Sequence, residues 1–326
     1  MRASDLASSD RRSPTIGYTF SDRGHAVIAD RIEIDTERCW GTADVNTPLV
    51  SCLMVTEDRP ALAARAIECF LAQSYPNKEL IVIDSSESDR LQHGIDAICY
   101  PPIKLHRMPG SRKSLGELRN IAVQQSAGEF VCQWDDDDLC DPDRLTVQMG
   151  AITALSADAC FLARQQLWWP TRHILAVSIR RIWEGTMVCA RDQMPLYPPL
   201  RRGEDTPLAF HLWRTARVVM LDEPRLYTYV FHGANTFGEA HFARHFAAAT
   251  QQSTGDAYAE RLRRLRTRVP IESDDAASPE PANQNGDNRQ RRTQSANGTP
   301  QFRGQRTLEV SVPAAVAPEP LFSEGC

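Results

Sequence analysis

Short apolar runs alternate with amphipathic helical segments between about residues 48 and 149, and this alternation constrains the fold more than any other feature of the chain. A helical pattern over 61–73 separates the first two runs, and the capping-box spacing of Ser114 and Glu117 opens a helix before the third. The apolar runs, each of the length of a buried strand, are residues 49–55, 79–83 and 129–134. Strands that alternate with helices pair in parallel, so we expect an α/β fold with an open, mostly parallel sheet flanked by helices.

The rest of the chain predicts one catalytic domain between two tails. With 326 residues and 42% hydrophobic content, the chain can bury one substantial core or two small ones, and one catalytic domain plus tails fits better. Residues 1–46 are polar without sustained periodicity, and we expect a flexible or loosely docked arm there. Residues 269–326 are rich in Pro, Asn, Gln, Ser and Arg, and we expect a disordered tail. The catalytic domain is therefore expected to span residues 47–268.

The pattern after residue 149 is less regular. An arginine-rich segment at 258–269 is interpreted as a solvated helix face, with contact to anionic lipid or a partner as the alternative. A helix is expected over 206–214. Candidate strands are residues 159–162, 174–179, 186–189, 218–221 and 227–230.

Charge and hydropathy exclude several classes of protein. The formal net charge of -5 gives no global attraction to nucleic acid. No apolar run approaches the ~20 residues that span a bilayer, and residues 1–12 lack the apolar core of a signal peptide. The nine cysteines include no Cys-x-x-Cys pair, so reduced thiols without zinc or disulfides are expected. These features favour a cytoplasmic protein, with peripheral contact at the inner face of the membrane as an open option.

Four consecutive carboxylates, Asp135–Asp138, directly follow the apolar run 129–134. Like charges this close resist ionisation unless a divalent metal or open water offsets them. Ligands of open α/β sheets bind beyond the carboxyl ends of strands, so we expect a metal-assisted site for a phosphorylated ligand. A solvated turn is the alternative interpretation. A calcium loop is excluded, because Cys140 stands where its glycine belongs and Thr146 where its bidentate glutamate belongs.

The same region resembles the nucleotide-sugar-binding half of family 2 glycosyltransferases, which have the GT-A fold. The matching segments, in chain order, are Pro48–Thr56, Arg59–Pro60, Leu71–Asp84, Arg119–Asn120 and Gly128–Phe130, which leads into Asp135–Asp138. The likeness is close over about residues 48–149 and looser to about 235. It implies an inverting, metal-dependent enzyme that moves a sugar from a nucleoside-diphosphate sugar to an acceptor hydroxyl. The acceptor could be a protein, a lipid-linked glycan, a polysaccharide or a small molecule.

The resemblance also implies a metal site. Asp135–Asp138 aligns with the Asp-x-Asp motif of the family, which makes Asp137 the expected ligand of Mg²⁺ or Mn²⁺. Asp135 and Asp136 are then expected near the ribose or behind the metal. His232 resembles the C-terminal histidine that in many such enzymes contacts metal or diphosphate, and a structural histidine is the alternative.

Further donor contacts follow from the resemblance. Asp84 takes the place beside the nucleoside, although the family usually has two aspartates where this chain has Asp84 and Ser85. Val55 and Arg119 are also assigned to the donor, with a helix-surface arginine as the alternative for Arg119. Gly185 is expected in the loop over the donor sugar, since glycine permits close backbone approach.

The acceptor side needs a carboxylate that takes a proton from the attacking hydroxyl. Gly203–Asp205 resembles the acidic motif that supplies this base, and Asp205 is the first choice, with Glu204 second. A helix N-cap is the alternative for an aspartate at this position. Trp168 and Trp169 are candidates for stacking on a sugar, and core packing is their alternative role.

Two other functions are weighed. A sugar nucleotidylyltransferase would share the parallel sheet but needs a glycine-rich, basic loop after the first strand, where this chain has the acidic residues Glu57 and Asp58. A non-catalytic nucleotide-sugar-binding or scaffold protein is the other alternative. The presence of both Asp137 and Asp205 favours the enzyme.

Overall fold

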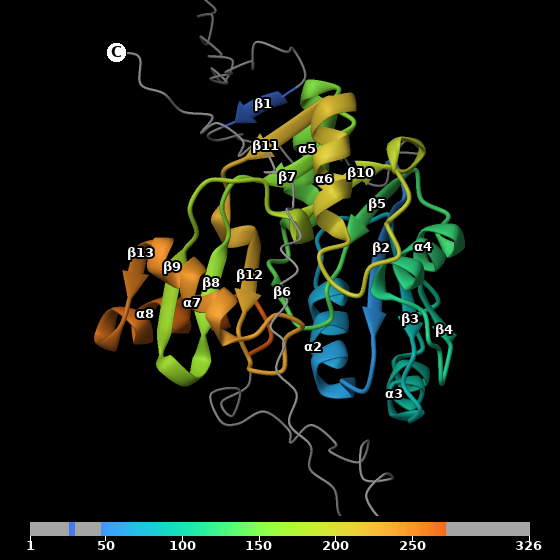
Figure 1. Ribbon diagram of the computed structural model, residues 1–326, viewed down its shortest axis with the longest axis horizontal. Helices are drawn as coiled ribbons and strands as arrows, with labels where there is room; N and C mark the ends of the chain where they lie inside the picture. The colour runs from blue at the N-terminus through green and yellow to red at the C-terminus, as the bar shows by residue number, and fades with distance from the viewer. Residues whose placement is uncertain (1–25, 30–46, 272–326) are drawn as a thin grey trace, which may run out of the picture. The chain divides into compact units, whose positions relative to one another are not determined.

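The computed structural model describes residues 26–29 and 47–271, and within them an eight-stranded sheet forms the centre of the fold (Figure 1). In spatial order its strands are β1 (Ala26–Ala29), β11 (Val218–Leu221), β7 (Ala159–Leu162), β10 (Val188–Ala190), β5 (Phe130–Gln133), β2 (Val50–Thr56), β3 (Lys78–Asp84) and β4 (Ile103–Arg107). β10 runs antiparallel to both of its neighbours, and the other pairs are parallel. The open, mostly parallel sheet expected from the sequence is confirmed.

Helices cover both faces of this sheet, as the alternation of strands and helices in the sequence predicts. On one face pack α2 (Pro60–Leu71), α3 (Arg90–Ile98) and α5 (Arg144–Leu155), and on the other α4 (Leu115–Gln125) and α6 (Asp205–Thr215). Strand β2 therefore contributes Cys52 and Met54 to one core and Leu53 to the other. Burial on both faces explains why β2 and β3 appear in the sequence as continuous apolar runs.

A second sheet of five strands lies beside the first. Its strands are, in order, β13 (Thr250–Ser253), β9 (Ile174–Val177), β8 (Gln166–Trp169), β12 (Tyr227–Val230) and β6 (Leu139–Cys140). The helices α7 (Glu239–Ala248) and α8 (Gly255–Arg266) pack against it. No helix in the described part of the chain is long and apolar enough to cross a membrane.

Described structure extends past both expected domain boundaries. Within the segment 1–46, residues Ala26–Ala29 form β1 and pair in parallel with β11; the remainder up to residue 46 lies outside the described residues. At the other end Val269 is 5% exposed and packs in the core, one residue beyond the expected boundary at 268. The part of the expected tail from residue 272 onward also lies outside the described residues.

The two tryptophans do not offer a surface for a sugar. Trp168 and Trp169 lie in β8 with exposures of only 1% and 3%. The Trp168 indole nitrogen donates to the Tyr258 hydroxyl at 3.2 Å, and Trp169 packs edge-on against Phe231. Of the two roles considered for them, core packing applies to both, because the second sheet and its helices enclose them.

Candidate active site

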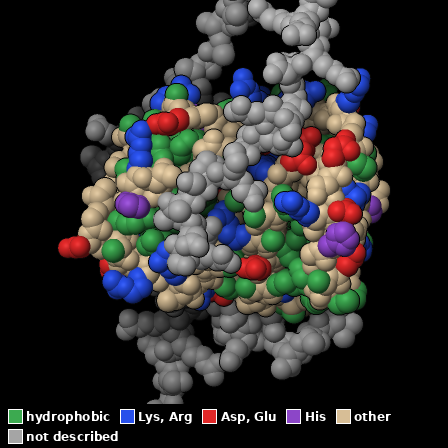
Figure 2. All heavy atoms as spheres, turned by 90° about the horizontal axis from the view of Figure 1, so that it is seen from below, with side chains coloured by type: hydrophobic (Ala, Val, Ile, Leu, Met, Phe, Trp, Pro, Cys, Tyr) green, Lys and Arg blue, Asp and Glu red, His purple; other side chains and the backbone are tan. Residues whose placement is uncertain are grey.

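A pocket opens where β2 and β5 end, and it collects most of the site residues expected from the sequence. Its empty volume, which includes open solvent at the mouth, is about 630 Å³. The expected residues that line it are Val55, Arg119, Asp135, Asp136, Asp137, Glu204 and Asp205. Figure 2 looks onto the end of the molecule at which β2 finishes, where Lys and Arg side chains lie beside acidic ones.

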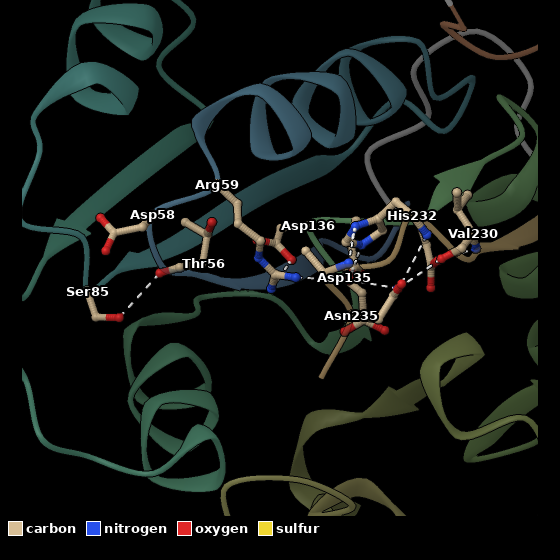
Figure 3. Close-up of polar contacts among 12 residues, drawn as sticks. Thr56, Asp58, Arg59, Ser85, Asp135, Asp136, Val230, His232 and Asn235 are labelled. Atoms are coloured by element: carbon tan, nitrogen blue, oxygen red, sulfur yellow. Dashed lines mark hydrogen bonds and ion pairs between the residues drawn. The ribbon is translucent and has the colours of Figure 1, made fainter. Parts of the chain in front are cut away.

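Arg59 neutralises two of the four consecutive aspartates. It stands between β2 and the first helical residue, Pro60. Its Nη2 lies 2.8 Å from Asp136 Oδ1, and its Nη1 lies 3.0 Å from Asp137 Oδ2 (Figure 3). Burial nevertheless raises the pKa of Asp136 to about 7, and the neighbouring charge of Asp137 adds to this.

Asp137 also contacts the chain that follows β12. Its Oδ2 lies 3.2 Å from His232 Nε2 and 3.4 Å from Asn235 Nδ2. Burial alone would raise the pKa of Asp137, but the hydrogen bond with His232 and the charge of Arg59 lower it below the ordinary value. The structure thus joins the expected metal ligands Asp137 and His232, although 95 residues separate them in the chain.

Arg119 connects the acidic segment to the start of α6. This α4 residue donates from Nη2 to Asp135 Oδ1 and from Nε to Glu204 Oε1, each at 2.7 Å. The side chains of Arg119 and Glu204 are only 8% and 2% exposed. Removing either side chain would therefore leave the charge of the other buried without this partner. Arg119 therefore has a structural task in addition to the expected donor contact.

Asp138 and Tyr227 fasten the acidic segment to the second sheet. Asp138 accepts from the Tyr227 hydroxyl at 2.6 Å and from the Val230 backbone nitrogen at 2.8 Å. The oxygen of the same hydroxyl also lies 3.1 Å from Asp135 Oδ2. Asp138 is 3% exposed, and burial raises its pKa well above the ordinary value. Its role in this arrangement is to position the other carboxylates.

Asp205 begins α6 and faces the pocket. Burial raises the pKa of its carboxyl, with a further contribution from Asp135 and an opposing one from Arg119. Burial likewise raises the pKa of Glu204, which stands at the N-cap position without capping the helix through its side chain. A raised pKa makes a carboxylate a stronger base, which suits general-base chemistry.

Two expected donor residues lie outside the pocket lining. Asp84, at the end of β3, is fully buried, and its Oδ1 accepts from the Ser86 backbone nitrogen at 2.9 Å. Gly185 packs behind Asp135: a Cβ at this glycine would lie 2.9 Å from Asp135 Oδ2 and 3.2 Å from the Tyr227 hydroxyl. Gly185 thus borders the acidic segment, whereas Asp84 stands apart from it.

The donor atoms of the acidic segment suit a hard divalent cation. Carboxylate oxygens of Asp135, Asp136 and Asp137 lie on one pocket wall, and the buried Oδ2 of Asp136 has no hydrogen-bond partner. Within the described residues, no three acidic, histidine or cysteine side chains stand ready to hold a metal together. Arg59 and Arg119 contact these carboxylates instead. Asp137 and His232 remain the residues that would hold the ion.

Sequence reasoning assigned no role to several pocket residues. Arg59, Tyr229 and Asn235 are among them, and all three line the pocket. Arg202 and Phe237 line it as well, and the guanidinium carbon of Arg202 lies 6.0 Å from the centre of the Phe237 ring. The position of Arg59, directly after a strand that ends at the site, was the one signal available.

Part of the chain is similar to known glycosyltransferases. Residues 51–201 match the family model described as "Glycosyl transferase family 2". The "Putative colanic acid biosynthesis glycosyl transferase WcaA" of Escherichia coli (strain K12) is 33% identical over 157 residues, which are 47% of this chain and 50% of that protein. The chain thus spans about half the length of this relative.

Two solved structures are similar. One is S. aureus TarS 1–349 in complex with UDP-GlcNAc, 18% identical, covering 70% of this chain and 69% of that chain with a TM-score of 0.47. The other is the mannosyltransferase PcManGT from Pyrobaculum calidifontis in complex with GDP-Man and Mn²⁺, 15% identical, covering 67% and 65% with a TM-score of 0.46. The family match and the relative above show that residues 51–201 of the chain are similar to glycosyl transferase family 2.

Proposed function

We propose that the pocket binds a nucleoside-diphosphate sugar with Mg²⁺ or Mn²⁺ and transfers the sugar, with inversion, to an acceptor hydroxyl. The observation that carries this proposal is the meeting of two acidic sets in one pocket. Asp135–Asp137 lie beyond β5, and Glu204 with Asp205 lies at the start of α6. The first set suits a metal–diphosphate group, and the second suits the acceptor hydroxyl.

On the donor side, Asp137 and His232 would hold the cation, and Asp135 is oriented for the ribose by Arg119 and Tyr227. When bound, a divalent cation neutralises the negative charge that develops on the departing diphosphate. The lowered pKa of Asp137 keeps this carboxylate ionised, which a metal ligand requires.

On the acceptor side, Asp205 accepts the proton of the acceptor hydroxyl while that oxygen attacks the anomeric carbon. The attack comes from the face opposite the diphosphate, so the configuration inverts. A carboxylate with a raised pKa binds this proton more strongly than an ordinary aspartate. Glu204 is less suited, because its charge is already paired with Arg119.

Donor binding and slow donor hydrolysis test this function directly. The full chain is mixed with a panel of nucleotide sugars, with and without Mn²⁺, starting with UDP-GlcNAc and GDP-Man. We expect one donor to bind and to be hydrolysed slowly in a metal-dependent way. Binding without hydrolysis or transfer would support the non-catalytic alternative, and no binding of any donor would overturn the proposal.

The Asp137→Asn variant tests the metal ligand. An amide lacks the charge that offsets a divalent ion, so calorimetry should show that the Mn²⁺-dependent gain in nucleoside-diphosphate affinity is lost. The fold should survive, because Asp137 lies in a bend outside the helices and strands. Unchanged affinity in this variant would remove Asp137 from the metal site.

A further inference from the structure

Arg59 lies where a cation shared by Asp136 and Asp137 would lie. Its two terminal nitrogens contact one oxygen of each carboxylate, at 2.8 Å and 3.0 Å (Figure 3). Both carboxylates belong to one short segment and are largely buried, with side-chain exposures of 3% and 14%. Two such charges this close repel each other unless a cation lies between them.

The arginines around the acidic segment differ in their freedom to move. The side chain of Arg119 is 8% exposed and is held between Asp135 and Glu204. The side chain of Arg59 is 27% exposed and lines the open pocket. Since Arg59 extends from the turn between β2 and α2, it can release the carboxylates by rotating its own side chain without unpacking a helix.

We propose that Arg59 is an exchangeable counter-ion of the metal site. It neutralises Asp136 and Asp137 while no metal is bound, gives up Asp137 when the divalent cation enters, and then turns its guanidinium to the diphosphate. The inference rests on the proposed function, because it assumes that the pocket takes a metal and a nucleoside diphosphate. Arginine suits both states, since its planar fork matches carboxylate and phosphate oxygens alike.

The exchange has opposite consequences for the two ligands. Mn²⁺ alone must displace Arg59, so the arginine weakens metal binding in the absence of nucleotide. The nucleoside diphosphate gains the released guanidinium, so the same arginine strengthens nucleotide binding once metal is present. A residue that only stabilises the fold would not change the two affinities in opposite directions.

Arg59→Gln in the full chain tests the inference. Titration of Mn²⁺ alone, followed by electron paramagnetic resonance, should show binding about tenfold tighter than in the wild type, the effect of ~1.4 kcal/mol. Calorimetric titration of UDP or GDP at saturating Mn²⁺ should show weaker binding by a similar factor. Unchanged or weaker Mn²⁺ binding in Arg59→Gln would overturn the inference.

The matched control is Arg65→Gln. Arg65 lies in α2, and its Nη2 donates to the backbone oxygen of Asp137 at 3.1 Å. This variant therefore removes a positive charge beside the acidic segment but leaves Arg59 on its oxygens of Asp136 and Asp137. Mn²⁺ affinity should rise much less than in Arg59→Gln. An equal rise in both variants would show that net charge, and not exchange at the carboxylates, governs the metal.

Arg59→Lys covers the case in which Arg59→Gln does not fold. Lysine keeps the charge between the carboxylates but has one nitrogen instead of a fork, so Mn²⁺ should bind more tightly than in the wild type and the diphosphate less tightly. Wild-type affinities in Arg59→Lys would contradict the exchange. If the wild type binds neither Mn²⁺ nor any nucleotide, the proposed function itself fails, which is distinct from a failure confined to Arg59.

Discussion

The Nε atom of Arg119 lies 2.7 Å from Glu204 Oε1 and joins α4 to the start of α6 through a buried ion pair. Glu204 is therefore neutralised and fixed before any substrate arrives. The next residue, Asp205, faces the pocket at the first turn of α6. These neighbours in the chain thus differ: Glu204 is paired with Arg119, whereas Asp205 faces the pocket, where we propose that it serves the acceptor.

This division predicts the effect of Asp205→Asn. The variant should bind donor and metal as the wild type does but transfer sugar more slowly by a factor on the order of 10²–10⁴, the range for a general base. Burial raises the pKa of Asp205, so wild-type transfer should fall off on the acid side at a higher pH than an ordinary aspartate would give. Turnover at saturating donor, measured against pH, checks both statements.

Glu204→Gln is the matched comparison for Asp205→Asn. It removes one of the two ion pairs of buried Arg119, so thermal stability should fall while the turnover of the folded protein changes less than in Asp205→Asn. Normal turnover in Asp205→Asn with collapse in Glu204→Gln would move the base to Glu204. Normal turnover in both would contradict the inverting mechanism.

Gly185→Ala should impair donor use more than folding. The added Cβ would lie 2.9 Å from Asp135 Oδ2, so this carboxylate must shift from Arg119. Misplacement of a positioning group costs roughly tenfold to hundredfold in kcat/KM. Steady-state kinetics with the identified donor, together with a thermal melt, separate the two effects. Wild-type kinetics would show that Asp135 adjusts without loss.

Alanine at two helical glycines should change the free energy of unfolding in different ways. A Cβ at Gly116 in α4 would lie 1.9 Å from the Pro198 backbone oxygen, so Gly116→Ala should lower the free energy of unfolding by about 1–3 kcal/mol. A Cβ at Gly94 in α3 meets nothing within 4 Å, so Gly94→Ala should be neutral or stabilising by up to ~1 kcal/mol. Denaturant unfolding measures both, and an equal loss in the two variants would contradict the packing argument.

The histidine pair His241 and His245 on α7 should make the stability of the fold depend on pH. His245 Nε2 lies 3.1 Å from His241 Nε2, and the His245 ring packs on Trp183. Burial lowers the pKa of His245 to about 4, with His241, Arg181 and Arg244 adding to the shift. The unfolded chain takes up this proton near pH 6.5, so the free energy of unfolding should fall as the pH drops from about 6.5 to 4.

His245→Phe tests this pH dependence, since phenylalanine keeps a ring against Trp183 and cannot be protonated. Thermal melts at pH 7.5 and pH 5.0 should show a smaller loss of Tm in the variant than in the wild type. The pKa of His241 is lowered as well, first by burial and then by Arg244 and Arg181, so some loss should remain. An identical loss in both proteins would show that other groups control the acid response.

The first half of the sheet was predictable because its sequence signals are local. Strands buried on both faces appear as apolar runs, and the capping box formed by Ser114 and Glu117 is present as expected. Strands 159–162, 218–221 and 227–230 also match their expected bounds. By contrast, the strand expected at 186–189 begins at Val188, since a 3-10 turn occupies Glu184–Thr186.

The partners of the site residues were less predictable, because they depend on contacts far apart in the chain. The acidic segment identified the pocket wall, but nothing local indicates that Arg59 reaches Asp137 or that Arg119 reaches Glu204, 85 residues away. The sequence left the role of the two tryptophans open for the same reason. An aromatic side chain suits a core and a sugar equally well, and only the second sheet determines that Trp168 is enclosed.

The two-residue strand β6 holds the acidic segment to the second sheet. It follows the acidic segment directly and pairs with β12, with Tyr227 opposite Cys140 and Thr228 opposite Leu139. A slip of one residue in this short ladder would turn every side chain of β12 to the opposite face and carry His232 away from Asp137. Attempts to change donor preference should therefore leave residues 139–140, 227–230 and Asn235 intact. They should vary Thr236 and Phe237, which line the pocket.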